Sequence, residues 1–264
     1  MLGKLLKHET KSYAKSVLPF LTAIIVMGLL VRGFSLLGQK VAIFNYASMF
    51  TIFAFVITIV LSIVYCFFLT IKHFYQKVLR DEGYLTNTLP VKKRSIISAH
   101  LITAIIFMVL TVVIIVIGCI IAFYEPESAG QVWEIAKGYL ETEFQIGIGA
   151  VITILITVML FSYISAVLAI YAAMAIGHSF AQNKIPYSIG IGVAFYISYE
   201  ILNLIGLGII VLINPDFMNI IQSNEVPTNM VFQIFSLVYI SSAIMIVTSY
   251  TLTNHFLKNK LNLE

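Results

Sequence analysis

The sequence predicts an all-α integral membrane protein with six transmembrane helices, on the evidence of its composition, six long apolar runs and an uneven distribution of basic residues. Of its 264 residues, 60% are hydrophobic and only 11% are charged, and the mean hydropathy is +0.98. Soluble domains carry about 25% charged residues, so a soluble core could not bury this surplus of apolar side chains. A lipid bilayer can accommodate it.

Six apolar runs divide the chain. They cover residues 17–38, 43–71, 100–123, 144–176, 188–213 and 231–253. Each reaches the ~20 residues that a helix needs to cross a hydrocarbon core of about 30 Å. The fourth run is the longest, so we expect its helix to tilt or to project beyond the membrane.

The basic residues indicate the orientation of the spans, because cytoplasmic loops carry an excess of Lys and Arg. One side of the membrane would hold the N-terminal arm, the loop after the second run, Lys184 and the C-terminal tail, with thirteen of the 16 basic residues. The other side would hold only Arg32, Lys40 and Lys137, and its loops are acidic. Both termini are therefore predicted to be cytoplasmic, in a multi-pass protein of the plasma membrane.

The predicted organisation has three parts. Residues 1–16 form an amphipathic interfacial helix, residues 17–253 form the transmembrane domain, and residues 254–264 form a cytoplasmic tail. The transmembrane domain includes a cytoplasmic loop, 72–99, and two outer loops, 124–143 and 214–230. In the first part, Lys4, Lys7, Lys11 and Lys15 recur at helical spacing, which suits contact with an anionic membrane surface. A simple orientation signal is the alternative.

Polar residues within the spans mark faces that turn toward other helices, where small and weakly polar side chains allow close contact. Thr51 and Thr58 share one face of the second span, and Tyr196 and Asn203 share one face of the fifth. Glu200 lies beside the latter face near mid-depth, where an acidic residue is costly. These residues either line a pathway with Glu200 as a substrate, proton or gating group, or only pack and hydrogen-bond between helices.

Enzymatic motifs are absent from the sequence. It contains no HExxH, GxSxG, GxxxxGK[ST] or GxGxxG segment, and its five histidines are scattered near span ends. Its two cysteines lie within apolar runs and have no metal-binding spacing. We therefore expect a protein that is not itself an enzyme and that binds no metal, cofactor or nucleic acid.

The cytoplasmic loop is the most distinctive segment of the chain. The second span is predicted to continue as a helix to about Asp81, Gly83 permits a break, and Pro90 ends a short helical turn. Exposed apolar residues rimmed by charge would make this loop a docking surface. The alternative is an ordinary interfacial loop in contact with lipid.

The segment Asp81–Ile96, DEGYLTNTLPVKKRSI, resembles the E-G-Y-L-x-x-T-L-P-V pattern in permease subunits of type-2 ABC exporters, which include peptide and antibiotic exporters of Gram-positive bacteria. In that family the loop is a coupling helix that inserts into a groove of a separate cytoplasmic ATPase. The resemblance assigns this role to Glu82, Gly83, Tyr84, Leu85, Leu89 and Pro90, and makes residues 1–16 the connecting helix.

The resemblance also implies the partners. Two copies of the ATPase would bind ATP and Mg²⁺, and a second permease, identical or related, would complete the pathway at a dimer interface of the first, second and fifth spans. The cargo would be a peptide, an antimicrobial or a lipid-like molecule. The segment 214–230 is shorter than the re-entrant helices of many members, and Glu125–Glu143 is expected to form an external helical cap.

Two other functions compete with this interpretation. An ion-gradient-driven secondary transporter would use Glu200 as its proton carrier, although the two halves of the sequence show no clear repeat. A non-transporting binding or immunity protein would use the acidic outer loops to attract a cationic peptide.

Overall fold

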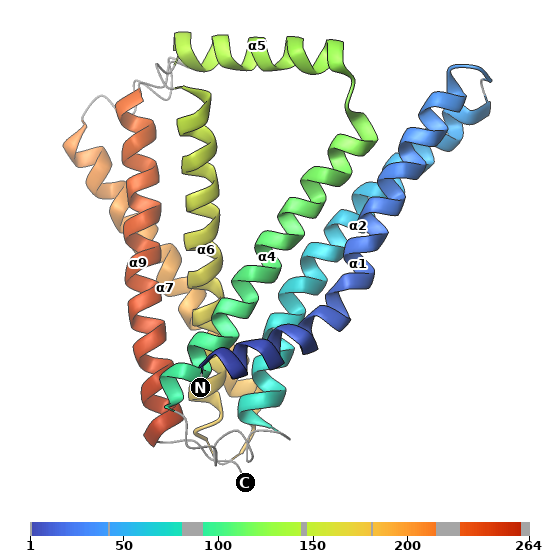
Figure 1. Cartoon of the computed structure of the whole chain (residues 1–264). Coiled ribbons are helices and arrows are strands. Elements are labelled where there is room, and N and C mark those ends of the chain that lie inside the picture. The colour runs from blue at the N-terminus through green and yellow to red at the C-terminus, as the bar shows by residue number, and fades with distance from the viewer. Residues whose placement is uncertain are drawn as a thin grey trace. The chain divides into compact units, whose positions relative to one another are not determined.

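The computed structural model describes residues 2–41, 43–80, 92–143, 147–180, 182–214 and 228–259. Helices are the only regular secondary structure within these residues. Six helices are long and apolar enough to cross a membrane (Figure 1). They are α1 (Leu2–Gly38), α2 (Ile43–Phe74), α4 (Lys93–Phe123), α6 (Ile148–Gly177), α7 (Lys184–Ile213) and α9 (Thr228–Asn259). The chain is therefore an α-helical multi-pass membrane protein, as its composition predicts.

The helix ends refine the predicted spans. A π-helical turn, η1 (Tyr75–Leu79), extends α2 beyond its apolar run, much as predicted. The predicted start of the fourth span at residue 144 is wrong, because Gly147 has an extended backbone and caps α6. Gly147 thus separates α6 from α5 (Pro126–Glu143), which confirms the helix expected between the third and fourth spans.

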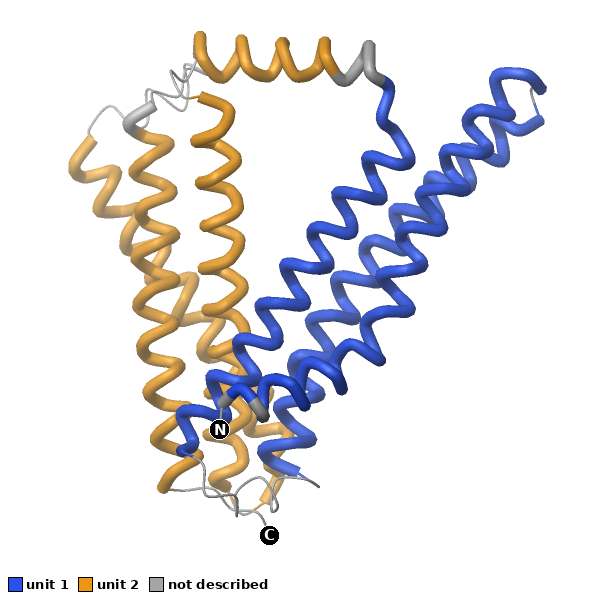
Figure 2. Tube along the Cα trace, in the orientation of Figure 1, with its two compact units in different colours: residues 1–129 blue, residues 130–264 orange. Residues whose placement is uncertain are grey.

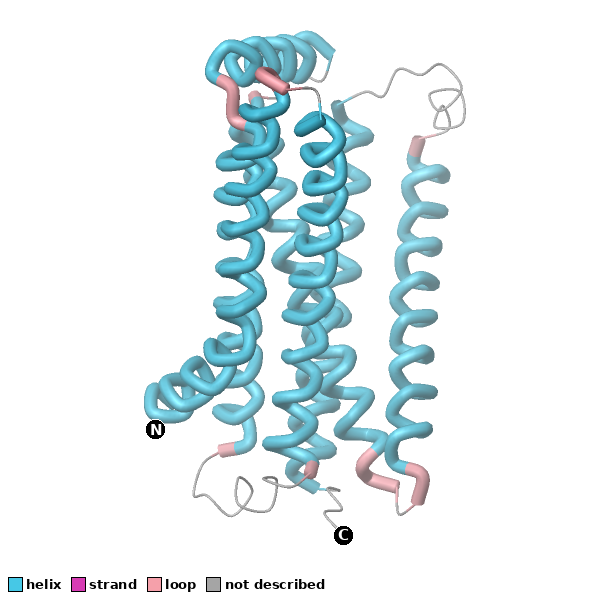
Figure 3. Tube along the Cα trace, turned by 90° about the vertical axis from the view of Figure 1, so that its right-hand side faces the viewer, coloured by secondary structure: helices cyan, strands magenta, loops and turns pink. Residues whose placement is uncertain are grey.

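Helix α1 contains both the predicted interfacial helix and the first span without interruption. Its N-terminal turns lie at a steep angle to the rest of the helix (Figure 3). Pro19 lies inside it, and a proline within a helix removes one hydrogen bond and clashes with the preceding turn, which kinks the helix. One continuous helix can therefore change direction between its basic part and its apolar part.

The chain divides into two compact units, residues 1–129 and 130–264 (Figure 2). In the first, α1 packs against α2 and α4. The backbones of α1 and α4 meet at two glycines, because a Cβ atom on Gly28 would lie 2.9 Å from the carbonyl oxygen of Gly118. Van der Waals packing drives helix association in lipid, so this close approach stabilises the unit.

In the second unit, α6 packs against both α7 and α9. The small residues at the end of α6 face α7: a Cβ atom on Gly177 would clash with Ser188, and one on Gly192 would lie 3.8 Å from the Ala173 methyl group. Toward α9, the Thr157 hydroxyl hydrogen-bonds to Tyr239. These small and weakly polar side chains are the contacts by which helices associate in a membrane.

Candidate functional site

A buried cluster of charged side chains joins three helices of the first unit near the N-terminus. The Lys77 ammonium of η1 lies 3.0 and 3.1 Å from the two carboxylate oxygens of Glu9 on α1. The Nδ1 atoms of His73 on α2 and His100 on α4 lie 3.8 and 3.6 Å from the same carboxylate. The Glu9 side chain is only 9% exposed, and that of Lys77 11%.

The sequence positions Glu9 on the buried face of α1. Glu9, Tyr13, Val17 and Leu21 follow one another at intervals of four, which places them on one side of a helix, and all four are buried. Lys7, Lys11 and Lys15 are exposed, as an interfacial helix requires, whereas the side chain of Lys4 lies outside the described residues. A single helix thus presents one basic surface and one surface that carries a carboxylate into the protein.

Tyr13 extends the cluster by one helical turn. Its hydroxyl donates to the Cys66 carbonyl oxygen at 2.7 Å and lies 2.6 Å from the Thr70 hydroxyl. Its ring stacks on Phe107 with centroids 4.6 Å apart and lies 5.0 Å from the His73 ring. Buried polar groups need such partners, because an unsatisfied hydroxyl costs about 1–3 kcal/mol.

This arrangement fixes the beginning of α1 to the end of α2 and to α4. A buried ion pair contributes little net stability when it forms, because both charges lose their hydration. Breaking one by removal of a single partner is costly, since the other charge stays buried without compensation. The cluster therefore acts as a specific connection that strongly disfavours any movement of η1 relative to α1.

Sequence reasoning missed this cluster, although one signal was present. Glu9 is the only acidic residue among the first 16, and it repeats at helical spacing with Tyr13 and Val17. Its partner Lys77 is 68 positions away. In the sequence, Lys77 is only one of several basic residues of the predicted cytoplasmic loop. The histidines His73 and His100, expected to have no role, both lie beside it.

The residues expected to contact an ATPase lie outside the described residues. These are Glu82, Gly83, Tyr84, Leu85, Leu89 and Pro90. Their segment begins directly after Arg80, which follows η1. Arg80, the last described residue before this segment, lies three positions after the buried Lys77.

A second candidate site lies in the second unit. Glu200 and Tyr196 of α7 line a pocket of about 380 Å³, together with residues of α6 and with Met245 of α9. Both are exposed in the single chain, and α7 has no buried residue. The Glu200 carboxylate makes no hydrogen bond or ion pair to any described residue. Its predicted bond to a neighbouring helix is therefore not observed in the described part of the chain.

The other predicted pathway residues make local contacts. The hydroxyls of Thr51 and Thr58 donate to backbone carbonyls of their own helix, at 2.9 and 2.8 Å. The Asn203 amide nitrogen donates to the Tyr199 carbonyl at 2.9 Å, while its buried carbonyl oxygen has no hydrogen-bond partner in the described structure. Within the second unit, Asn203 is not among the residues that line the pocket with Glu200.

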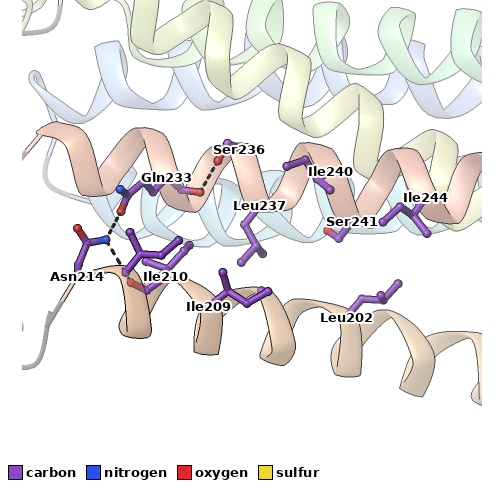
Figure 4. Close-up of a pocket in the computed structure, with 12 residues that line it drawn as sticks. Leu202, Ile209, Ile210, Asn214, Gln233, Ser236, Leu237, Ile240, Ser241 and Ile244 are labelled. Atoms are coloured by element: carbon purple, nitrogen blue, oxygen red, sulfur yellow. Dashed lines mark hydrogen bonds between the residues drawn. The ribbon is translucent and has the colours of Figure 1, made fainter.

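An apolar pocket of about 370 Å³ separates α7 from α9 near residues 202–214 and 233–244 (Figure 4). Its walls are mostly Leu and Ile side chains such as Ile209 and Ile240. At one end the Asn214 amide donates to the Gln233 side-chain oxygen at 2.8 Å. The two helices approach each other at Gly206, where a Cβ atom would lie 2.6 Å from Leu237.

His178, just beyond the end of α6, is a buried titratable group of the second unit. Burial lowers the pKa of its imidazole, a hydrogen bond to the Met174 carbonyl oxygen at 2.9 Å opposes this effect, and the nearby Lys184 charge lowers the pKa further. The surroundings of His178 therefore favour its neutral form.

Comparisons with protein-family models, curated proteins and solved structures find no match. The functional evidence therefore comes from three features of the chain, namely its helical membrane fold, its buried charge cluster and the pocket at Glu200.

Proposed function

We propose that this chain is the membrane-spanning permease subunit of an ATP-driven exporter of the type-2 ABC class, with both termini in the cytoplasm. The proposal is supported by the resemblance of Asp81–Ile96 to the coupling loop of that family. It is supported further by the six spanning helices and by the distribution of Lys and Arg about them.

The observation that carries the proposal is the ion pair between Glu9 and Lys77. A coupling loop must transmit the motion of an ATPase to the transmembrane helices. The segment next to the loop must therefore be firmly connected to those helices, so that it does not simply deform. The loop follows η1 in the chain. Contacts of 3.0 and 3.1 Å tie η1 to α1, and His100 of α4 lies against the same carboxylate. A displacement of the loop would therefore act on α1, α2 and α4 together.

The proposal assigns ATP hydrolysis to a partner. Nucleotide biases a two-state equilibrium through differential binding, and this chain carries no P-loop motif to provide it. We propose a complex of two permeases and two cytoplasmic ATPases, which hold ATP and Mg²⁺, with the pathway between the permeases. The large exposed apolar side chains of α2, such as Phe50 and Phe53, and the lack of buried residues in α7 suit contact with a second permease.

Affinity purification from the native membrane in mild detergent, followed by mass spectrometry, tests the proposal. We expect a stoichiometric P-loop ATPase to co-purify with the wild-type chain and to be lost from Leu85→Asp and Tyr84→Ala. Trp133→Ala, which removes an exposed aromatic side chain from α5, is the matched control and should retain the ATPase. A wild-type preparation that contains no ATPase after gentle crosslinking would overturn the proposal.

The same preparation separates the alternative functions. Reconstituted vesicles that transport cargo without any ATPase, in response to an ion gradient, would identify a secondary transporter. Cargo binding without ATP-dependent movement would identify a non-transporting binding or immunity protein.

A further inference from the structure

We infer that the pocket around Glu200 binds an organic cation, that is, a positively charged nitrogen or phosphorus centre on an apolar body. This inference names the cargo class of the proposed exporter. Only the transport of such a cation rests on the proposed function. Binding itself depends only on the second unit of this chain.

The pocket has the size and composition of a small-molecule site. Its volume of about 380 Å³ lies within the range of roughly 300–1,000 Å³ that is usual for ligand pockets. Ala166 and Ala169 of α6 and Gly192 of α7 are among its lining residues, and such small side chains leave space for the body of a ligand. Ser162 and Ser165 add hydroxyl groups, and Glu200 is the only charged residue in the lining.

No described basic residue lines the pocket beside the Glu200 carboxyl group. Glu200 lies near the middle of α7, whose one basic residue, Lys184, is about 24 Å away at 1.5 Å per residue. The described spans α6 and α9 offer only Lys258 and His255, close to the end of α9. Ionisable groups at this depth pair with a counter-charge or mark a functional site, so a cationic ligand would supply the missing partner.

The other walls favour an organic cation over a metal ion. The described residues contain no group of three or more His, Cys, Asp or Glu side chains suited to a metal, and a hard cation requires several oxygen ligands. Phe195, Tyr196 and Tyr199 line the same pocket as Glu200 instead. Aromatic faces attract large, weakly hydrated cations through their quadrupoles. The hydroxyl of Tyr199 lies 3.4 Å from Ser242 on α9, a contact that helps to orient its ring.

The neighbouring pocket shows what the Glu200 pocket has in addition. Between α7 and α9, the lining is mostly Leu and Ile and carries no charged residue among those described, and its amide groups pair with each other at one end (Figure 4). Selectivity for charge in this unit therefore depends on Glu200.

Binding of radiolabelled tetraphenylphosphonium to the purified full chain in neutral detergent tests the inference, by equilibrium dialysis. We expect saturable binding at one site per chain that an excess of uncharged triphenylphosphine oxide does not displace. Glu200→Gln should weaken binding at least tenfold, a free-energy loss of about 1.4 kcal/mol. Glu200→Asp should retain most of the affinity, and Tyr196→Leu should weaken binding about threefold through loss of a cation–π contact.

Glu134→Gln is the matched control, because it removes the same charge from an exposed position on α5. Its affinity should equal that of the wild type, which excludes a general electrostatic effect. The inference is overturned by wild-type affinity in Glu200→Gln, by an equal loss in Glu134→Gln, or by the absence of saturable binding to a wild-type chain that melts cooperatively. Because the assay contains no ATPase, a failed co-purification would overturn the exporter proposal and leave this result unaffected.

Discussion

Replacing Lys77 by Met should destabilise the first unit more than any exposed charge substitution. Methionine nearly preserves the length and volume of the side chain but removes the ammonium that contacts both oxygens of Glu9. The carboxylate would remain buried beside His73 and His100 without its main counter-charge. Removing one member of a buried ion pair costs about 3–5 kcal/mol, which we expect as the loss in free energy of unfolding.

The two cysteines provide the assay. Both are free and both lie in the first unit, with Cys66 buried and Cys119 partly buried. A thiol-reactive fluorophore therefore reports the unfolding of this unit. Titration of the purified protein with sodium dodecyl sulfate, followed by labelling, would give the free-energy difference between the variants.

A double-mutant cycle distinguishes the buried pair from a simple loss of packing. Glu9→Gln alone should cost a similar amount, whereas the double variant with Lys77→Met should be less destabilised than the sum of the two, because no charge remains buried alone. Lys11→Met, an exposed position on the same helix, should change stability by less than about 0.5 kcal/mol. If both single variants behave like Lys11→Met, the cluster does not hold α1 to η1.

Three further predictions concern packing, hydrogen bonding and pH. Gly28→Leu should force α1 away from Gly118 and cost about 1–3 kcal/mol, whereas Gly33→Leu, where nothing lies within 4 Å, should be nearly neutral in the same assay. Tyr13→Phe should cost about 1 kcal/mol for its lost hydrogen bonds, and an unchanged labelling transition would refute the network. Since burial lowers the pKa of His178, the unfolded state binds more protons near the ordinary histidine pKa. The second unit should therefore lose stability as the pH falls below about 6.5. His178→Asn should weaken this pH dependence of stability, measured in thermal melts that do not rely on tryptophan fluorescence.

The spans were predictable because a bilayer imposes a simple length requirement. Any helix that crosses it needs about 20 apolar residues, and residues 43–71 or 231–253 meet that condition whatever they pack against. The start of the fourth span was wrong because apolar residues before Gly147 extended the hydropathy pattern past the point where the backbone leaves the helix. A hydropathy pattern reports only how apolar the side chains are. The first residue of a helix depends instead on the backbone conformation, which the pattern does not contain.

The candidate sites were less predictable, for a different reason. Glu200 was recognisable alone, because a carboxylate within an apolar run is costly wherever its helix lies. The residues that form the pocket around it, such as Ser165 on α6 and Met245 on α9, could not be found by spacing along α7. Nor did the helical spacing of Thr51 and Thr58 show that their hydroxyls bond to their own backbone.

The sequence by itself determined the class of the protein and its six spans, since these follow from transfer of side chains between water and lipid. Tertiary structure alone decided that Glu9 is a buried anchor, although it lies in a basic segment that would suit a membrane surface. Its role depends on Lys77, His73 and His100, which reach it from two other helices. Pairing between distant residues is set by how helices pack, and packing is a property of the folded chain that no local pattern contains.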